Sequence, residues 1–258
     1  WNIFDGMFEF SFKGWANSLP KPYSKNTIGQ TLSCIKNWLN YAHDRGLLSY
    51  TSFRKWRTKY NEEHGDAVYL TDAELQKVEN IDFFSDEIRS QVRKNLNLKR
   101  LEETRDLFLL ACQTGLRHSD WGYNLQHAKI TNGILRVYNT KTKKEVKLSY
   151  MPKIKSIIEK YGSFSKLPKP CDKAQTVRQL RLICKLAGID DEVVVKGEFV
   201  KKYDAVGTHT ARRSFVTNLI LKNAPIHSIC AATGHTSVTM LEKYNRLNDV
   251  ERVSGLVY

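Results

Sequence analysis

Apolar residues follow a helical period along most of this chain, and that spacing limits the folds it can adopt. The alternating steps of four and three that mark one helical face are met by Ile28, Leu32, Ile35, Leu39 and Ala42. Ser24 or Asn26 can cap the start of this helix, and Gly46 stands where it should end. The pattern predicts one long helix early in the chain.

Further helices and a few short strands are expected downstream. Thr71-Asp72-Ala73-Glu74 is a capping box, which marks a helix start. The predicted helices cover 102–114 (ending at Gly115), 151–160, 176–187 and most of the final third. The predicted strands cover 134–138, 145–148, 193–195 and 198–200, the first preceded by an Asn132-Gly133 turn. The expected fold class is mainly α with small β-hairpins, that is, α+β.

A polar stretch at 61–66 divides the chain into two modules. Residues 1–66 are predicted to form a small helical domain, and residues 67–258 a larger mixed α/β domain. In the first, Trp38 and Trp56 are expected to pack in the core or at its rim. Because the chain starts at Trp1 and not at Met, we expect an upstream segment that is missing here.

The balance of charge favours an anionic partner. Lys and Arg number 41 against 27 Asp and Glu, so the formal net charge is 41 − 27 = +14. Basic residues occur throughout, as expected of a folded surface that follows a nucleic-acid backbone, and nucleic acid is favoured over an acidic membrane. No apolar run approaches the ~18 residues of a membrane span, and no signal peptide is visible.

Five cysteines without paired short spacings predict reduced thiols, with neither a disulfide framework nor a zinc site. Cys34 and Cys112 lie in apolar helical patterns and are expected to be small core residues. These features are typical of a protein of the cytosol.

An ordered set of polar residues in the C-terminal two-thirds carries the candidate chemistry. The set is Arg117 in Thr-Gly-Leu-Arg-His-Ser-Asp, Lys141 in Asn-Thr-Lys-Thr, His209 and Arg212 in Thr-His-Thr-Ala-Arg-Arg, His235 in Thr-Gly-His, and Tyr244. Guanidiniums hold phosphate oxygens in a bidentate fork, imidazoles transfer protons, and a phenol can serve as a nucleophile. These groups together are what metal-free attack on a phosphodiester needs.

Local spacing suggests how some of these side chains are held. Asp120, three residues after Arg117, is expected to receive a charge-assisted hydrogen bond from it. His209 and Arg212 are three apart and so project from one face of a helix.

The start of that helix can be capped by Thr208 or Thr210, which places unpaired amide groups near any bound phosphate. Arg213 lies off the face that His209 and Arg212 share, and it is expected to be exposed.

The motifs, in this order, resemble those of the tyrosine recombinase (phage integrase) family, in the style of mobile-element integrases. Thr-Gly-Leu-Arg-His-Ser-Asp is similar to the first arginine box, Thr-His-Thr-Ala-Arg-Arg to the His-x-x-Arg box, and Thr-Gly-His, nine residues before Tyr244, to the last box. The basic turn with Lys141 is similar to the hairpin lysine of the family. Ser119-Asp120-Trp121-Gly122-Tyr123 departs from the commoner acidic-then-leucine pattern, so altered packing is expected there.

The resemblance covers about 70–250 and implies that 67–258 is a tyrosine recombinase catalytic domain. Residues 1–66 resemble, more weakly, the helical core-binding (SAM-like) DNA-binding domain. The implied activity is site-specific DNA recombination or integration through a 3′-phosphotyrosine. The implied catalytic set is Tyr244 as nucleophile with Arg117, Lys141, His209, Arg212 and His235, supported by Asp120.

In the implied mechanism, Arg117, Arg212 and His235 bind the non-bridging phosphate oxygens. Lys141 protonates the leaving 5′-oxygen, and His209 assists proton transfer at the tyrosine. The choice of Lys141 over Lys143 or Lys144 stays open, because the register of the turn is not determined by the sequence. No metal and no other cofactor is implied.

The implied partners are double-stranded DNA core sites, with a homotetramer assembling on DNA and accessory DNA-bending proteins as possible helpers; no membrane is involved. The implied location is the bacterial cytoplasm, in association with the nucleoid. The candidates for DNA contact are Lys21, Tyr23, Lys25, Lys143 and Lys144.

Two other functions remain open. One is a type IB topoisomerase, which shares the constellation of catalytic residues but works as a monomer. The other is a catalytically silent DNA-binding regulator of the same fold, against which the presence of all six catalytic residue types argues.

Overall fold

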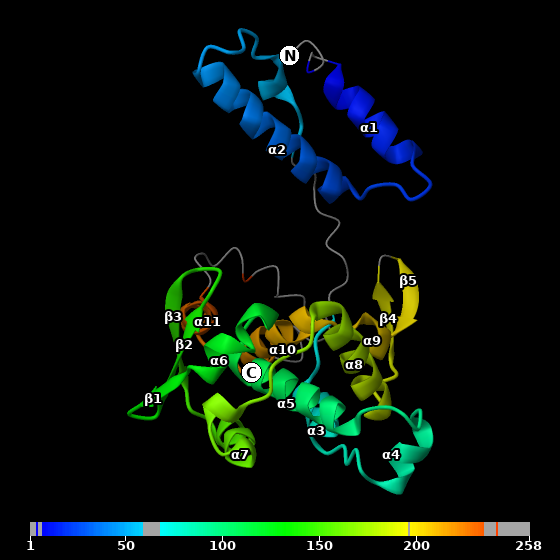
Figure 1. The fold of residues 1–258 in the computed structure, drawn as a ribbon, viewed down its shortest axis with the longest axis vertical. Coiled ribbons are helices and arrows are strands. Elements are labelled where there is room, and N and C mark those ends of the chain that lie inside the picture. Colours follow the sequence, from blue (N-terminus) through cyan, green and yellow to red (C-terminus); the bar gives the residue numbers. More distant parts are fainter. Residues whose placement is uncertain (1–3, 5–6, 59–67, 196, 235–240, 242–258) are drawn as a thin grey trace, which may run out of the picture. The chain divides into compact units, whose positions relative to one another are not determined.

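The computed structural model describes residues 4, 7–58, 68–195, 197–234 and 241 of the chain. The chain divides into two compact units, 1–64 and 65–258, each with its own apolar core (Figure 1). In the described part, helices predominate and two small antiparallel sheets accompany them. The predicted fold class, mainly α with small β-hairpins, is confirmed.

The first unit is helical. Its elements are α1 (Phe8–Ser18), α2 (Lys25–Asp44) and the 3-10 turn η2 (Ser52–Lys55). Ser24 caps α2, its side chain accepting from the Thr27 amide at 3.1 Å, and Gly46 follows the end of the helix with a φ of 71°. The predicted helical face is buried at Ile28, Leu32, Leu39 and Ala42, with Ile35 partly buried. This helix is therefore confirmed together with its cap.

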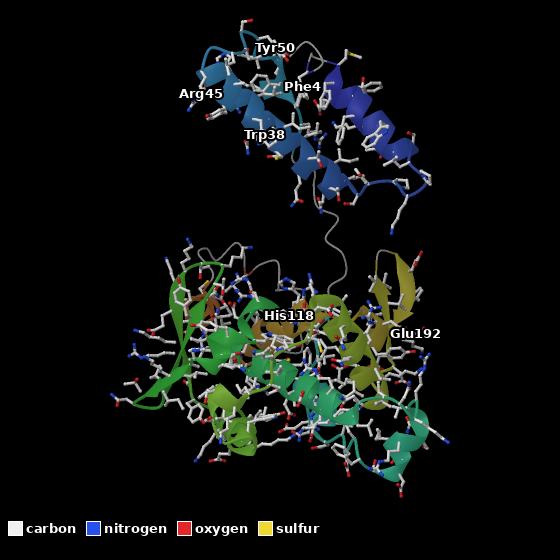
Figure 2. The ribbon with its side chains drawn as sticks, in the orientation of Figure 1. Phe4, Trp38, Arg45, Tyr50, His118 and Glu192 are labelled. Atoms are coloured by element: carbon white, nitrogen blue, oxygen red, sulfur yellow. The ribbon has the colours of Figure 1, made fainter. Side chains whose placement is uncertain are left out.

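One flank of α2 is exposed where packing was predicted. Trp38 is 74% exposed, so the prediction that it packs in the core or at its rim is wrong (Figure 2). Cys34, four residues earlier, is exposed as well, which corrects its assignment to the core. Tyr41 and Arg45 extend this row at helical spacing, and the Arg45 guanidinium lies 4.4 Å from the Tyr41 ring centroid. The row lies beside the face that buries Leu32 and is exposed at both of its aromatic residues, Trp38 and Tyr41.

The second unit is built around one buried helix. Its helices are α3 (Asp72–Glu79), α4 (Asp86–Gln91), α5 (Leu98–Thr114), α6 (Tyr123–Gln126), α7 (Pro152–Tyr161), α8 (Lys173–Leu186), α9 (Lys202–Ala205), α10 (Thr208–Leu221) and α11 (Ile226–Thr233), with 3-10 turns η3 (His118–Asp120) and η4 (Phe164–Lys166). The predicted Thr71 capping box opens α3, with both reciprocal hydrogen bonds present. Helix α5 packs against α3, α7, α8 and α10, so it buries nearly its whole circumference and not a single stripe.

Two sheets lie at opposite ends of this unit, with α5 and α10 between them (Figure 1). One has the order β1 (Lys129–Thr131), β2 (Ile134–Asn139), β3 (Lys144–Ser149), and the other pairs β4 (Glu192–Val195) with β5 (Glu198–Lys201). The predicted strands are confirmed, but β1 was not predicted. Its three residues are all exposed and show no alternation, and only pairing with β2 across the Asn132-Gly133 turn makes them a strand.

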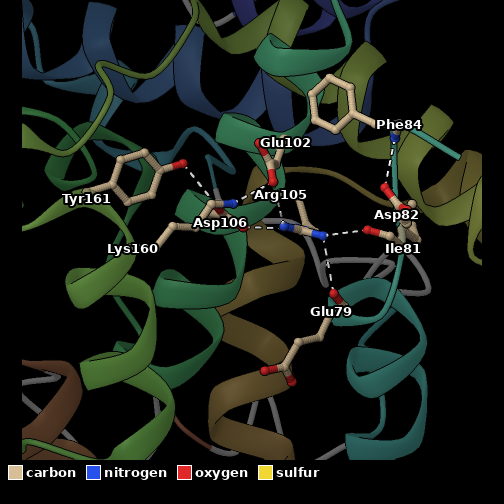
Figure 3. A network of polar contacts seen from close by, with 9 residues as sticks. All are labelled: Glu79, Ile81, Asp82, Phe84, Glu102, Arg105, Asp106, Lys160 and Tyr161. Carbon is tan, nitrogen blue, oxygen red and sulfur yellow. Dashed lines mark hydrogen bonds and ion pairs between the residues drawn. The ribbon is translucent and has the colours of Figure 1, made fainter.

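A buried charge network ties α5 to its neighbours (Figure 3). Arg105 donates from Nε to Oδ1 of Asp106 at 2.9 Å and from Nη1 to the Glu79 and Ile81 carbonyls. Oδ2 of Asp106 accepts from Lys160 Nζ at 2.7 Å and from the hydroxyl of the neighbouring tyrosine at 2.9 Å. Burial, and then the charge of Asp106, raise the pKa of that tyrosine, Tyr161. The network fixes α5 against α3 and α7.

Replacing Asp106 with alanine is expected to lower the free energy of unfolding by about 3 kcal/mol, because the buried Arg105 would lose its nearer carboxylate, at 2.9 Å, and keep only the pair with Glu102 at 3.6 Å. Urea unfolding followed by circular dichroism measures the change. Glu159→Ala is the matched control, since its pair with Lys155 is exposed and contributes about 0–0.5 kcal/mol. Equal small losses in the two variants would contradict the prediction.

Candidate active site

The first predicted motif lies where α5 ends. Gly115 closes the helix with a φ of 65°, a left-handed value that suits glycine. A Cβ there would stand 2.6 Å from the Phe215 ring and 3.1 Å from Thr233 Cγ2, so this backbone lies directly against α10 and the end of α11. Arg117 follows two residues later, half-buried, and its Nη1 donates to Oδ1 of Asn139 at 3.2 Å.

Arg212 joins three of the predicted motifs. Its side chain projects from α10 and is 1% exposed. Nη1 donates to the Gly115 carbonyl at 2.9 Å, and Nη2 donates to the Thr233 carbonyl at 2.7 Å. Gly115 is two residues before Arg117, and Thr233 is two residues before His235. One guanidinium therefore holds together the ends of two helices that the sequence separates by more than a hundred residues.

His209 stands in a strongly positive field. It occupies the first turn of α10 with its side chain exposed overall and its imidazole partly desolvated. That desolvation lowers the pKa of His209, and the positive charges of Arg213, Lys173, Arg212 and Arg117 lower it further. The end of α5, the start of α8 and α10 thus bring their cations to one place, and they favour a neutral imidazole there.

Two local expectations about α10 need correction. The N-cap is Gly207 and not a threonine; Thr208 is the first helical residue, while Thr210 reaches back so that its Oγ1 accepts from the Gly207 amide at 3.0 Å. Arg213 is half-buried and not fully exposed, and among the described cations its charge affects His209 most. Helical spacing alone did not reveal this, because neighbouring side chains in a first turn can still converge electrostatically.

The predicted basic turn connects β2 to β3. Lys141 is exposed on it, and its amide donates to Oδ1 of Asn139 at 3.2 Å. Lys143 has a φ of 52° and Lys144 begins β3; both are exposed. Gly234 lies beside this turn, since a Cβ there would be 3.7 Å from Thr142 Oγ1, and it lies against β3, 3.3 Å from Val146 Cγ1. The turn therefore approaches the Thr-Gly-His motif at Gly234.

Asp120 is held differently from the prediction. The structure contains no bond between Arg117 and Asp120 among the described residues. Oδ1 of Asp120 instead accepts from the Thr140 amide at 3.1 Å and from Asn124 Nδ2 at 2.8 Å. The physical reason is that η3 turns the carboxylate inward, where it is fully buried, while the guanidinium extends to Asn139. Asp120 thus supports the lysine turn and not the arginine.

Two of the predicted catalytic residues, His235 and Tyr244, lie outside the described residues. The candidates for DNA contact in the first unit, Lys21, Tyr23 and Lys25, are all exposed, with Lys25 at the start of α2. The structure thus brings together Arg117, Arg212, His209 and the Lys141 turn.

Sequence reasoning missed residues that the structure places at this site. Asn139 was detectable: inward positions of β2 alternate as Leu135, Val137 and Asn139, so an amide falls on a core position just before the basic turn. Lys173 and His118 carried no such signal. Partial burial and the charge of Lys173 lower the pKa of His118, whose Nε2 lies 3.2 Å from Thr176 Oγ1.

The described residues contain no group of three or more His, Cys, Asp or Glu side chains arranged to hold a metal ion. Nor does any helix in the described ranges combine the length and apolarity needed to cross a bilayer.

Comparison with known proteins gives a consistent set of matches. The model of the phage integrase family matches residues 84–251. The tyrosine recombinase XerC of Thermodesulfovibrio yellowstonii is 22% identical over 236 residues, which cover 88% of this chain and 73% of that protein.

Solved structures with a similar fold include two protein–DNA complexes. The XerH site-specific recombinase bound to difH substrate, in a pre-cleavage complex, has a TM-score of 0.58 at 17% identity, covering 99% of this chain and 70% of that one. The Tn1549 transposon integrase in complex with transposon right end DNA has a TM-score of 0.64 at 14% identity, covering 95% of this chain and 83% of that one. At these identities the likeness establishes a shared fold.

Proposed function

The chain belongs to the phage integrase family and is a site-specific tyrosine recombinase, and we propose that it cleaves and rejoins double-stranded DNA through Tyr244. The relatives that it matches are recombinases and integrases, which favours this activity over a type IB topoisomerase or a silent DNA-binding regulator. The Tn1549 integrase among them favours a mobile-element role.

The observation that supports the proposal most is the position of Arg212. Its guanidinium bonds to Gly115 and Thr233, so the backbones that lead to Arg117 and His235 converge on one side chain. A guanidinium carries five N–H donors, so one arginine can serve the backbone and a phosphate together. Convergence of motifs that lie far apart in the sequence is what a single phosphate-binding centre requires.

In the proposed reaction, the Tyr244 oxygen attacks the scissile phosphorus, the bond from phosphorus to the 5′-oxygen breaks, and a 3′-phosphotyrosine forms. Arg117, Arg212 and His235 bind the non-bridging oxygens as negative charge grows. Rejoining is the reverse attack by a 5′-hydroxyl, and the phosphotyrosine conserves the bond energy, so no nucleotide is consumed.

Two further residues move protons in this scheme. Lys141 protonates the departing 5′-oxygen, and His209 accepts the proton of the tyrosine. Lys141 is favoured over Lys143 and Lys144 because its amide is bonded to Asn139, which also bonds to Arg117. Asp120 supports the same turn through Thr140.

The proposed partner is double-stranded DNA at core sites, consistent with a net charge of +14. We assign core binding to the first unit, through Lys21, Tyr23 and Lys25, and catalysis to the second, with Lys143 and Lys144 contacting phosphates beside the turn. Exchange of strands between two duplexes requires four protomers on DNA, and DNA-bending accessory proteins fit this assembly.

Covalent trapping tests the function directly. A core site is first selected by the chain from a random duplex library, and the selected duplex is then nicked beside the scissile phosphate so that religation is prevented. A denaturing gel should show a DNA adduct that protease treatment removes. Specific binding without any adduct would favour the silent regulator, and relaxation of supercoiled DNA without strand exchange would favour the topoisomerase.

The rate of covalent attachment should depend on the protonation of His209. Since its pKa lies below the usual value of about 6.5, the neutral, proton-accepting form predominates at pH 7. The rate is therefore expected to be constant near neutral pH and to fall as the pH drops through that lowered pKa. Single-turnover rates across the pH range measure this.

The variant His209→Asn should be slower and should lose this inflection, whereas His118→Asn should retain it, although the pKa of His118 is also lowered. Lys173→Gln should move the inflection to higher pH, because the charge of Lys173 helps to lower the pKa of His209. A pH profile that is the same in His209→Asn and the wild type would show that His209 is not the proton acceptor.

A further inference from the structure

Asn139 contacts two members of the proposed catalytic set, Arg117 and Lys141. It is the last residue of β2 and points inward, as Leu135 and Val137 do, and its side chain is 1% exposed. Its Oδ1 accepts from Arg117 Nη1 at 3.2 Å, from the Lys141 amide at 3.2 Å and from the Thr142 amide at 3.3 Å. A single amide oxygen thus links a phosphate-binding guanidinium to the turn that carries the proton donor.

The nitrogen of this side-chain amide faces Gly234, in the Thr-Gly-His motif. Nδ2 of Asn139 is buried and has no hydrogen-bond partner among the described residues, and the same holds for Oγ1 of Thr142. Each lies 3.7 Å from the position that a Cβ on Gly234 would take. An unsatisfied buried amide carries a desolvation cost that an aliphatic side chain at this inward position would avoid. Packing of the sheet therefore does not explain why an amide occupies this position, whereas the three hydrogen bonds of its oxygen do.

The turn needs such support. Lys141 is exposed, and a lysine stem has many rotamers, so its ammonium is placed only as well as its backbone is held. Asp120 fixes the Thr140 amide, and Asn139 fixes the next two amides along the turn. Of these two supports, only Asn139 also bonds to Arg117. Misplacement of a reacting group by ~1 Å can slow a reaction by ~10²-fold.

We propose that Asn139 is a positioning residue for strand cleavage. Its Oδ1 holds the Arg117 guanidinium in a fixed position relative to the Lys141 turn. Phosphate binding and protonation of the leaving oxygen are thereby coordinated. The inference rests on the proposed function. In the step concerned, the bond from Tyr244 oxygen to phosphorus forms, the bond from phosphorus to the 5′-oxygen breaks, and a proton passes from Lys141 to that oxygen. Asn139 contacts neither the DNA nor the proton.

Sulfur substitution of the leaving oxygen isolates the part of the step that Lys141 performs. A 5′-thiolate departs without a proton because a thiol is far more acidic than an alcohol. The nicked core-site duplex is therefore prepared with either oxygen or sulfur at the 5′-bridging position. The full chain is compared with Asn139→Leu, Asn139→Asp and Lys141→Ala. Ser149→Ala, an exposed change at the far end of β3, is the control.

With the oxygen substrate, Asn139→Leu is expected to attach ~10²-fold more slowly than the wild type, and Asn139→Asp, which keeps the acceptor oxygen, is expected to retain most of the rate. With the sulfur substrate, Asn139→Leu and Lys141→Ala should both recover by ~10-fold or more relative to the wild type. DNA affinity and the Ser149→Ala rates should not change. A merely structural defect would slow both substrates alike.

Amide hydrogen exchange gives a second readout that needs no catalysis. The amides of Lys141 and Thr142 should exchange faster in Asn139→Leu and normally in Ser149→Ala and Asn139→Asp. Unchanged exchange in Asn139→Leu, a wild-type rate on oxygen, or equal losses on both substrates would each overturn the inference. A wild-type chain that forms no adduct with either substrate would instead refute the proposed function, and the inference with it.

Discussion

Replacing Tyr244 with phenylalanine is expected to abolish covalent attachment of the chain to DNA and to leave its affinity for DNA unchanged. The substitution removes only the hydroxyl, which is the proposed nucleophile, and keeps the ring. A free phenol has a pKa of ~10 and is a poor nucleophile at neutral pH. In the proposed mechanism, the cations around His209 and its neutral imidazole supply the field and the base that such a phenol needs.

The measurement is a denaturing gel of the nicked core-site duplex, with binding followed separately by gel shift. Tyr203→Phe is the matched control: Tyr203 belongs to α9, with the Lys185 ammonium 5.7 Å from its ring centroid, and it is not in the proposed site. This control should form the adduct at the wild-type rate. A phosphotyrosine adduct that persists in Tyr244→Phe would mean that another residue attacks.

Replacing Arg212 with leucine should lower both the stability of the protein and the rate of covalent attachment to DNA. Loss of its bonds to the Gly115 and Thr233 carbonyls is expected to lower the free energy of unfolding by about 3 kcal/mol, because both acceptors are left buried and the bonds are charge-assisted. Loss of one donor to the phosphate should slow attachment by ~10²–10³-fold. Both effects follow from the loss of the same guanidinium.

Arg212→Lys tests whether the positive charge alone is enough. Lysine keeps the charge but lacks the planar fork, so it cannot bond two carbonyls in the same geometry, and both measurements should still show a loss. Arg178→Leu, an exposed change on α8, should alter neither. Urea unfolding and single-turnover attachment report the two quantities. An Arg212→Lys variant with wild-type values in both would contradict the role given to the guanidinium.

Much of the fold was predictable because it rests on local rules. The spacing of Ile28 to Ala42, the Ser24 cap and the Thr71 capping box each depend on residues within one or two turns of a helix. Gly115 could be recognised as a helix end in the same way. The order and spacing of the motifs also sufficed to predict the family, since a set of short motifs in a given order is a property of the sequence alone.

What the sequence determined by itself is therefore most of the longer elements, the fold class and the residue types of the candidate site. Only the tertiary structure decided which groups meet: Arg117 with Asn139, Asp120 with Thr140, and Arg212 with two carbonyls. These partners lie about 20 to 100 residues apart, and their pairing follows from how α5, α10, α11 and the sheet pack. Helical periodicity and strand alternation report the inward face of one element, but they carry no information on which inward group of another element it will face.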